Sequence, residues 1–174
     1  MTGIRFIPAP LQATFDLSLA NRDLYEKEFQ SMSEYEEDSI GQWLKIAKAK
    51  GETKDSDPVL LELIVELHKK IDRLTQIVKN EEKHLLPLPN SANISDIGFE
   101  HIKLEEEILE PNQEYYMRIS MPLFPKRDMP LFIEAISKDV AKIVQIHEKD
   151  ERDWNAYVTA RERVMIRQMK GKNV

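Results

Sequence analysis

The strongest periodic pattern in the chain lies between residues 57 and 85. Apolar side chains recur there at alternating steps of four and three residues, which is the spacing of a heptad repeat. Asp57 and Pro58 precede the repeat and suit the N-cap and the first position of a helix. The pattern predicts one helix over residues 57–85 with a continuous apolar seam. The seam residues are Leu60, Ile64, Leu67, Ile71, Leu74 and Val78.

The residue types along this seam predict self-association. Leucine occupies every d position, and isoleucine or valine occupies every a position, a choice that favours packing against another helix of the same kind. Leu61, Leu63 and Ile77 widen the apolar face into the flanking positions. A broad face favours a four-helix assembly over a dimer, and packing on the protein's own core is the alternative. We therefore expect a homo-oligomer, with a tetramer favoured over a dimer.

The residues before the heptad repeat show a looser helical pattern. Leu24, Phe29, Ile40 and Leu44 are spaced at helical intervals, and Gly51 stands where a C-terminal cap is expected. The polar stretch "ETKDSDP" follows and is typical of a linker. We expect residues 1–56 to form a helical N-terminal region that ends in this linker.

After residue 85 the apolar period shortens to two. "YYMRISM" alternates apolar and polar positions, and "GFEHIKL", "PLFIEAISK" and "KIVQIHE" are also typical of strands. The connections are too short for parallel crossovers, so the strands are expected to be antiparallel. "KDERDWNAYVTARERVMIRQMK" then returns to helical spacing. The fold class predicted is α+β, in which residues 86–174 form a small antiparallel barrel with a C-terminal helix.

Composition and charge exclude several kinds of function. The 174 residues include no cysteine, which excludes disulfides, thiolate metal ligands and a cysteine nucleophile. A net charge of −6 argues against nucleic acid as a partner, and the cationic stretch at residues 161–172 is interpreted as a basic helix end. No apolar run reaches the roughly 18 residues of a membrane span. We expect a cytoplasmic protein without membrane insertion.

Motifs of catalysis are not found in the sequence. It has no HExxH motif, no nucleophile elbow and no glycine-rich phosphate loop, and its four histidines stand far apart. The acidic run at residues 34–38 has no convergent ligands beside it. We therefore predict that the protein is not an enzyme and holds no metal.

One short polar motif stands at the start of the strand-rich half. In "NISDIGF", Asn93, Ser95 and Gly98 have the spacing NxSxxG. With the strands and the helix that follow, this half resembles the PilZ domain, whose members bind cyclic di-GMP and carry a (D/N)xSxxG motif. The resemblance implies a six-stranded antiparallel barrel, with Asn93, Ser95 and Gly98 on the surface that receives the guanine bases.

The sequence departs from this family at a second motif. PilZ domains place RxxxR just before the first barrel strand, where two arginines clamp the phosphates of the ligand. The corresponding stretch at residues 71–89, "IDRLTQIVKNEEKHLLPLP", contains Arg73 as its only arginine, and the nearest match to the spacing is Lys69 with Arg73. We therefore expect a degenerate site and no cofactor, with cyclic di-GMP binding not favoured.

These observations together predict a non-catalytic, PilZ-like adaptor. It is expected to self-associate through the heptad helix and to act on an unidentified regulatory protein. The resemblance implies a role in motility, pilus or surface-attachment regulation. The alternative is a genuine cyclic di-GMP receptor that uses arginines from elsewhere, such as Arg5, Arg22 or Arg127.

Overall fold

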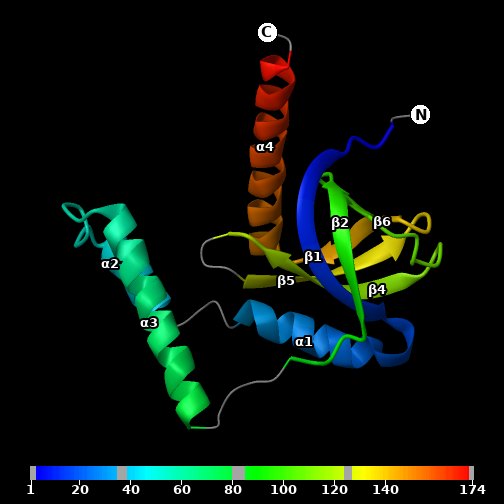
Figure 1. The fold of residues 1–174 in the computed structure, drawn as a ribbon. Helices are drawn as coiled ribbons and strands as arrows, with labels where there is room; N and C mark the ends of the chain where they lie inside the picture. The colour runs from blue at the N-terminus through cyan, green and yellow to red at the C-terminus, as the bar shows by residue number, and fades with distance from the viewer. Residues whose placement is uncertain (1–2, 35–38, 80–84, 124–126, 173–174) are drawn as a thin grey trace. The chain divides into compact units, whose positions relative to one another are not determined.

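The computed structural model describes residues 3–34, 39–79, 85–123 and 127–172 (Figure 1). In chain order the elements are β1 (Ile7–Leu17), a 3-10 turn η1 (Leu19–Asn21), α1 (Arg22–Glu34), α2 (Ser39–Ala49), α3 (Pro58–Val78), β2 (Asn90–Ile97), β3 (His101–Leu104), β4 (Glu114–Met121), β5 (Arg127–Ala135), β6 (Val140–Ile146) and α4 (Glu148–Gly171).

The six strands close into an antiparallel barrel. Their order around it is β1-β2-β3-β6-β5-β4, and each strand pairs antiparallel with both neighbours. Side chains alternate between the apolar interior and the outer surface, as the two-residue period of a strand requires. Leu11, Met117 and Leu131 are among the residues that fill the interior. The predicted α+β class and antiparallel barrel are confirmed.

The first strand of this barrel was not predicted. Residues 7–17 were expected to belong to a helical region, but they form β1, which pairs with both β2 and β4. The expectation was wrong because Pro8 and Pro10 disguise a strand that buries every second residue from Ile7 to Phe15. The prolines lie at the outward-facing positions, where β1 is irregular in its pairing with β2.

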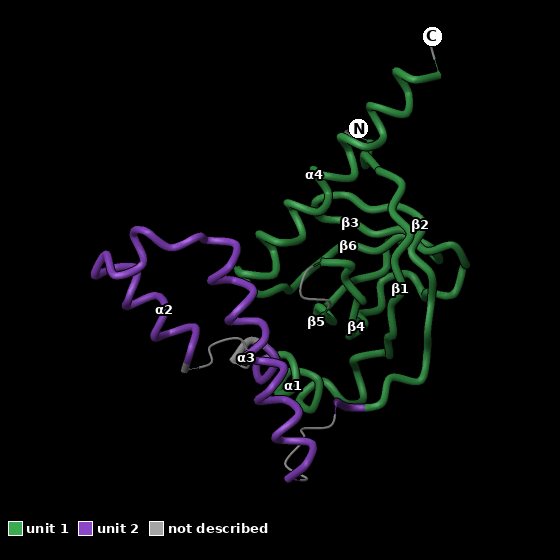
Figure 2. Tube along the Cα trace, turned by 60° about the vertical axis from the view of Figure 1, so that its left-hand side comes forward, with its two compact units in different colours: residues 1–29, 87–174 green, residues 30–86 purple. Residues whose placement is uncertain are grey.

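The chain divides into two compact units, one of which combines two stretches that are separated in the sequence (Figure 2). Residues 1–29 and 87–174 form the barrel unit, and residues 30–86 form a helical unit inserted between β1 and β2. The predicted segments were residues 1–56, 57–85 and 86–174, whereas the first 29 residues lie in the barrel unit.

In the barrel unit, the first part of α1 packs on the outside of the barrel. Tyr25 stacks on Tyr116 of β4, with ring centroids 5.0 Å apart, and Phe29 packs against Phe132 of β5 at 5.5 Å. The guanidinium of Arg22 lies 3.8 Å from the centre of the Phe132 ring. This aromatic contact fixes residues 22–29 of α1 on β4 and β5.

The helical unit contains α2 and α3, which lie side by side (Figure 2). Asp57 caps α3 as predicted, because its carboxylate accepts a hydrogen bond of 2.9 Å from the Val59 amide. The predicted heptad helix is confirmed from Pro58 to Val78, and residues 80–84 lie outside the described residues. All six seam residues are more than half exposed.

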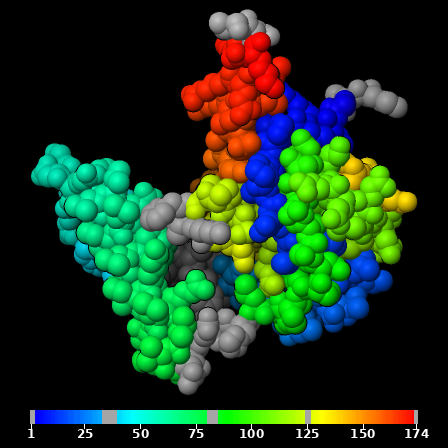
Figure 3. Space-filling view, in the orientation of Figure 1, coloured from blue at the N-terminus to red at the C-terminus, as the bar shows by residue number. Residues whose placement is uncertain are grey.

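The C-terminal helix was predicted correctly and packs on the barrel through its first half. Trp154 and Val158 are buried there. Farther along, α4 extends past the barrel, as its red end shows in the space-filling view (Figure 3). In the part of the chain that the structure describes, no helix has the length and apolar character needed to cross a membrane.

Candidate functional site

Gly98 of the predicted motif has a structural role at the turn between β2 and β3. Its amide donates a hydrogen bond of 2.7 Å to the carbonyl of His101, and its own carbonyl accepts one of 3.0 Å from the Trp154 indole. A Cβ atom at this position would lie only 2.9 Å from the carbonyl oxygen of Arg5. Glycine is therefore needed because the N-terminal segment passes so close.

We expect Gly98→Ala to destabilise the barrel unit by about 1–3 kcal/mol, because the backbone of residue 5 must shift to admit a methyl group. Urea denaturation followed by tryptophan fluorescence measures the change. Gly171→Ala is the control, since a Cβ there meets nothing within 4 Å, and it should change the free energy of unfolding by less than about 0.5 kcal/mol. Equal midpoints for the Gly98 variant and the wild type would contradict this account.

Ser95 is held by its own strand and its neighbour. Its hydroxyl donates a hydrogen bond of 2.7 Å to the Asp96 carboxylate and lies 3.4 Å from the Lys103 carbonyl of β3. The pairing of β2 with β3 shifts register between Ile94 and Asp96, so the hydroxyl fills an irregular position in the ladder. The Ser95 hydroxyl therefore contacts residues of β2 and β3 within the barrel sheet.

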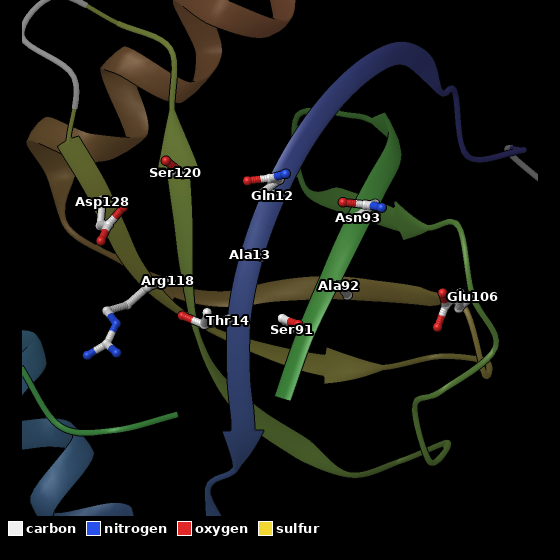
Figure 4. A pocket seen from close by; sticks show the side chains of 10 residues that line it. All are labelled: Gln12, Ala13, Thr14, Ser91, Ala92, Asn93, Glu106, Arg118, Ser120 and Asp128. Atoms are coloured by element: carbon white, nitrogen blue, oxygen red, sulfur yellow. The ribbon is translucent and has the colours of Figure 1, made fainter. Parts of the chain in front are cut away.

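Asn93 lies apart from the other two motif residues, on the outer face of β2. Asn93 pairs with Gln12 of β1, and Gln12 pairs on its other side with Ser120 of β4. Ser120 in turn pairs with Asp128 of β5. These four residues, which we call the polar row, cross four strands and line an open hollow of about 410 Å³ (Figure 4). A neighbouring hollow of about 310 Å³ shares the first three residues of the row. Neither hollow is lined by Ser95 or Gly98.

The charges around the larger hollow do not favour an anionic ligand. Arg118 lines it, but one terminal nitrogen of its guanidinium contacts both oxygens of the buried Glu28 carboxylate, at 2.9 and 3.0 Å. Tyr116 donates a 2.5 Å hydrogen bond to the same carboxylate. Burial and this carboxylate strongly raise the pKa of Tyr116, which stays protonated. The other charged residues that line the hollow, Glu106 and Asp128, are acidic.

The arginine motif was sought in the wrong stretch of the chain. The predicted comparison used the residues before 86, but the first barrel strand is β1, so the relevant segment is the one before Ile7. That segment, "MTGIRF", contains Arg5 as its only arginine and no RxxxR spacing. Lys69 and Arg73 belong to α3 in the helical unit. The given sequence shows no RxxxR spacing in the residues before β1.

The other arginines considered as substitutes are already paired. Arg22 contacts the carboxylates of Glu26 at 3.0 Å and Glu114 at 3.1 Å. Arg127 contacts Asp150 and Asp153, each at 2.6 Å.

Sequence reasoning missed the polar row, because its residues come from four strands. Within the described ranges, no group of three or more histidine or acidic side chains is arranged to hold a metal ion.

A closed six-stranded antiparallel barrel followed by a C-terminal helix is the fold that the PilZ resemblance implied, and the structure confirms that expectation of the fold. The chain is similar to the crystal structure of a pathogenic protein from Xanthomonas campestris, described as a new tetrameric PilZ domain self-assembled via an unusual helical bundle. The match covers 98% of this chain and 93% of that chain, at 13% identity and a TM-score of 0.39. No protein-family model and no curated protein matches the sequence.

Proposed function

We propose that the protein is a non-catalytic PilZ-like signalling adaptor that self-associates through α3 and acts by contact with a regulatory protein. Its cyclic di-GMP site is degenerate. A role in motility, pilus or surface-attachment regulation comes from the family resemblance. The observation that carries the proposal is the exposed heptad seam on α3.

The exposure of the seam supports self-association. Leu60, Ile64, Leu67, Ile71, Leu74 and Val78 are between 52% and 82% exposed. A contiguous apolar stripe of this kind is unusual on a protein that remains a monomer. Leu63 and Ile77 of α3 and Trp43 and Ile46 of α2 are exposed too. These additional apolar residues favour a bundle of more than two helices, so a tetramer remains the favoured assembly.

Three observations support a degenerate ligand site. Gly98 and Ser95 serve the barrel itself, whereas Asn93 faces a separate hollow. The charged residues that line that hollow are Glu106, Asp128 and Arg118, and the charge of Arg118 is compensated by Glu28. The segment before β1 supplies one arginine where two are needed to clamp a phosphodiester ligand.

Light scattering and a calorimetric titration with cyclic di-GMP on the same sample test the proposal. We expect an oligomer at tens of micromolar protein and a Kd for cyclic di-GMP no tighter than about 100 μM, because charge-assisted contacts to phosphate are missing. Sub-micromolar binding would instead establish the receptor alternative, and replacing Arg5, Arg22 and Arg127 one at a time would then locate the clamp. A monomer would rule out the self-association.

A further inference from the structure

The apolar seam of α3 has a flank on each side, and the g flank is the more open one. Leu63, Lys70 and Ile77 hold its g positions, and all three are exposed. On the other flank, Leu61 and His68 hold two of the e positions and are half-buried within the helical unit. A second helix that packs on the seam therefore has more free surface to meet on the g flank.

The g flank is apolar at both ends and charged in the middle. Leu63 is 48% exposed and Ile77 is 42% exposed, and Lys70 stands midway between them. In a parallel pair of helices a g residue faces an e residue of the partner, so Leu63 would face His68 of the second copy. In a symmetric antiparallel pair g residues face g residues, so Leu63 faces Ile77 of the second copy. The antiparallel pair thus matches apolar with apolar side chains on this flank.

We propose that α3 pairs antiparallel with α3 of a second copy, about a twofold axis beside residue 69. The inference rests on the proposed function, in which α3 self-associates. With the axis at this place, each d residue of the seam packs beside an a residue of the second copy. Every layer then combines one leucine with one β-branched side chain, and no seam residue is left without a partner. The layers are Leu60 with Val78, Ile64 with Leu74, and Leu67 with Ile71.

This orientation also agrees with an assembly larger than a dimer. Isoleucine or valine at a with leucine at d favours two strands when the helices are parallel, yet the exposed apolar residues outside the seam favour a bundle of more helices. A tetramer with three perpendicular twofold axes has antiparallel neighbours, and this is a common symmetry of homotetramers. The two Lys70 side chains face each other at the axis, where water and salt screen the repulsion of exposed charges.

Single engineered cysteines can report the orientation, because the 174 residues include none. Leu60→Cys and Val78→Cys, at the two ends of the seam, are mixed as reduced proteins and then oxidised. We expect the mixed disulfide to form at least about tenfold faster than either variant links to itself, because the two copies of residue 60 lie about 27 Å apart along the helix axis. Glu62→Cys, at an outer f position, gives the background rate of random collision.

Charge complementation tests the g flank separately. Leu63→Glu and Ile77→Lys each place a charge against an apolar residue of the second copy, so each variant alone should associate at least about tenfold more weakly than the wild type. In the mixture the new carboxylate faces the new ammonium group, and association should return to within about threefold of the wild type. Leu63→Lys mixed with Ile77→Lys is the matched control and should gain nothing.

Failure of the orientation and failure of the self-association give different results. If Leu60→Cys links to itself as fast as to Val78→Cys, the antiparallel pairing is overturned. It is also overturned if Leu63→Glu and Ile77→Lys gain nothing on mixing. In both cases an oligomeric wild type leaves the proposed function standing, whereas a wild type that is monomeric at tens of micromolar by light scattering refutes the self-association and this inference together.

Discussion

Ile71→Lys is expected to turn the oligomer into a folded monomer. Ile71 lies at the central a position of the seam, and it is 52% exposed in the single chain, so lysine there should not disturb the chain's own packing. In an assembly the same side chain would enter a hole on the facing helix. Burying an unpaired ammonium group there costs several kcal/mol per chain, enough to dissociate a bundle about three heptads long. Light scattering measures the mass, and circular dichroism confirms that the chain remains folded.

A lysine on the outer side of α3 is the control for this prediction. Glu62 is exposed at an f position, so Glu62→Lys should leave the oligomer intact. Lys69, also at an f position, is less suitable because it pairs with the buried Glu66 at 3.1 Å. Wild-type protein that is already monomeric at tens of micromolar would contradict the role of the seam. Equal dissociation by both lysine variants would show an effect of charge alone.

Glu28→Ala is expected to destabilise the barrel unit by about 3–5 kcal/mol, because it leaves the Arg118 guanidinium buried without its carboxylate. Both side chains are nearly buried, and Tyr116 would also lose the acceptor of its hydroxyl. The contact joins α1 to β4, so residues 22–29 should loosen from the barrel first. Urea denaturation measures the free energy of unfolding, and hydrogen exchange locates the loosened segment.

Two further variants test whether the buried charge is the cause. Lys27→Ala removes an exposed side chain from the same helix and should change stability by less than about 0.5 kcal/mol. Adding Arg118→Met to Glu28→Ala also removes the buried guanidinium and should recover part of the loss. If Glu28→Ala costs less than about 1 kcal/mol, water already compensates Arg118, and the ion pair does not fix α1.

Elements whose signal is local were predicted from the sequence. The Asp57 cap and the heptad spacing predicted α3, and the alternation in "YYMRISM" predicted β4 with its correct inner and outer faces. α4 followed from helical spacing after the last strand. Such signals are contained in a single helix or strand, because periodicity depends only on neighbours along the chain.

The NxSxxG motif alone could not show whether its three residues form one site. The family resemblance implied that Asn93, Ser95 and Gly98 lie together on the surface that receives the guanine bases. The pairing of β2 with β3 is irregular beside Ser95, so the serine lies at the contact between the two strands, and the indole of Trp154 donates a hydrogen bond to the Gly98 carbonyl. Both β3 and Trp154 lie outside the six residues of the motif.

By itself, the sequence determined the α+β class, the heptad seam and most of the helices and strands. Only the tertiary structure decided that residues 7–17 close the barrel, that Asn93 joins Gln12 in the polar row, and that Arg118 is paired with Glu28, 90 residues away. It also brought Arg161 to the carbonyl of Pro8, across 153 residues. The physical reason is that barrel closure and buried ion pairs gain their free energy from many distant groups at once, against the entropy of closing long loops.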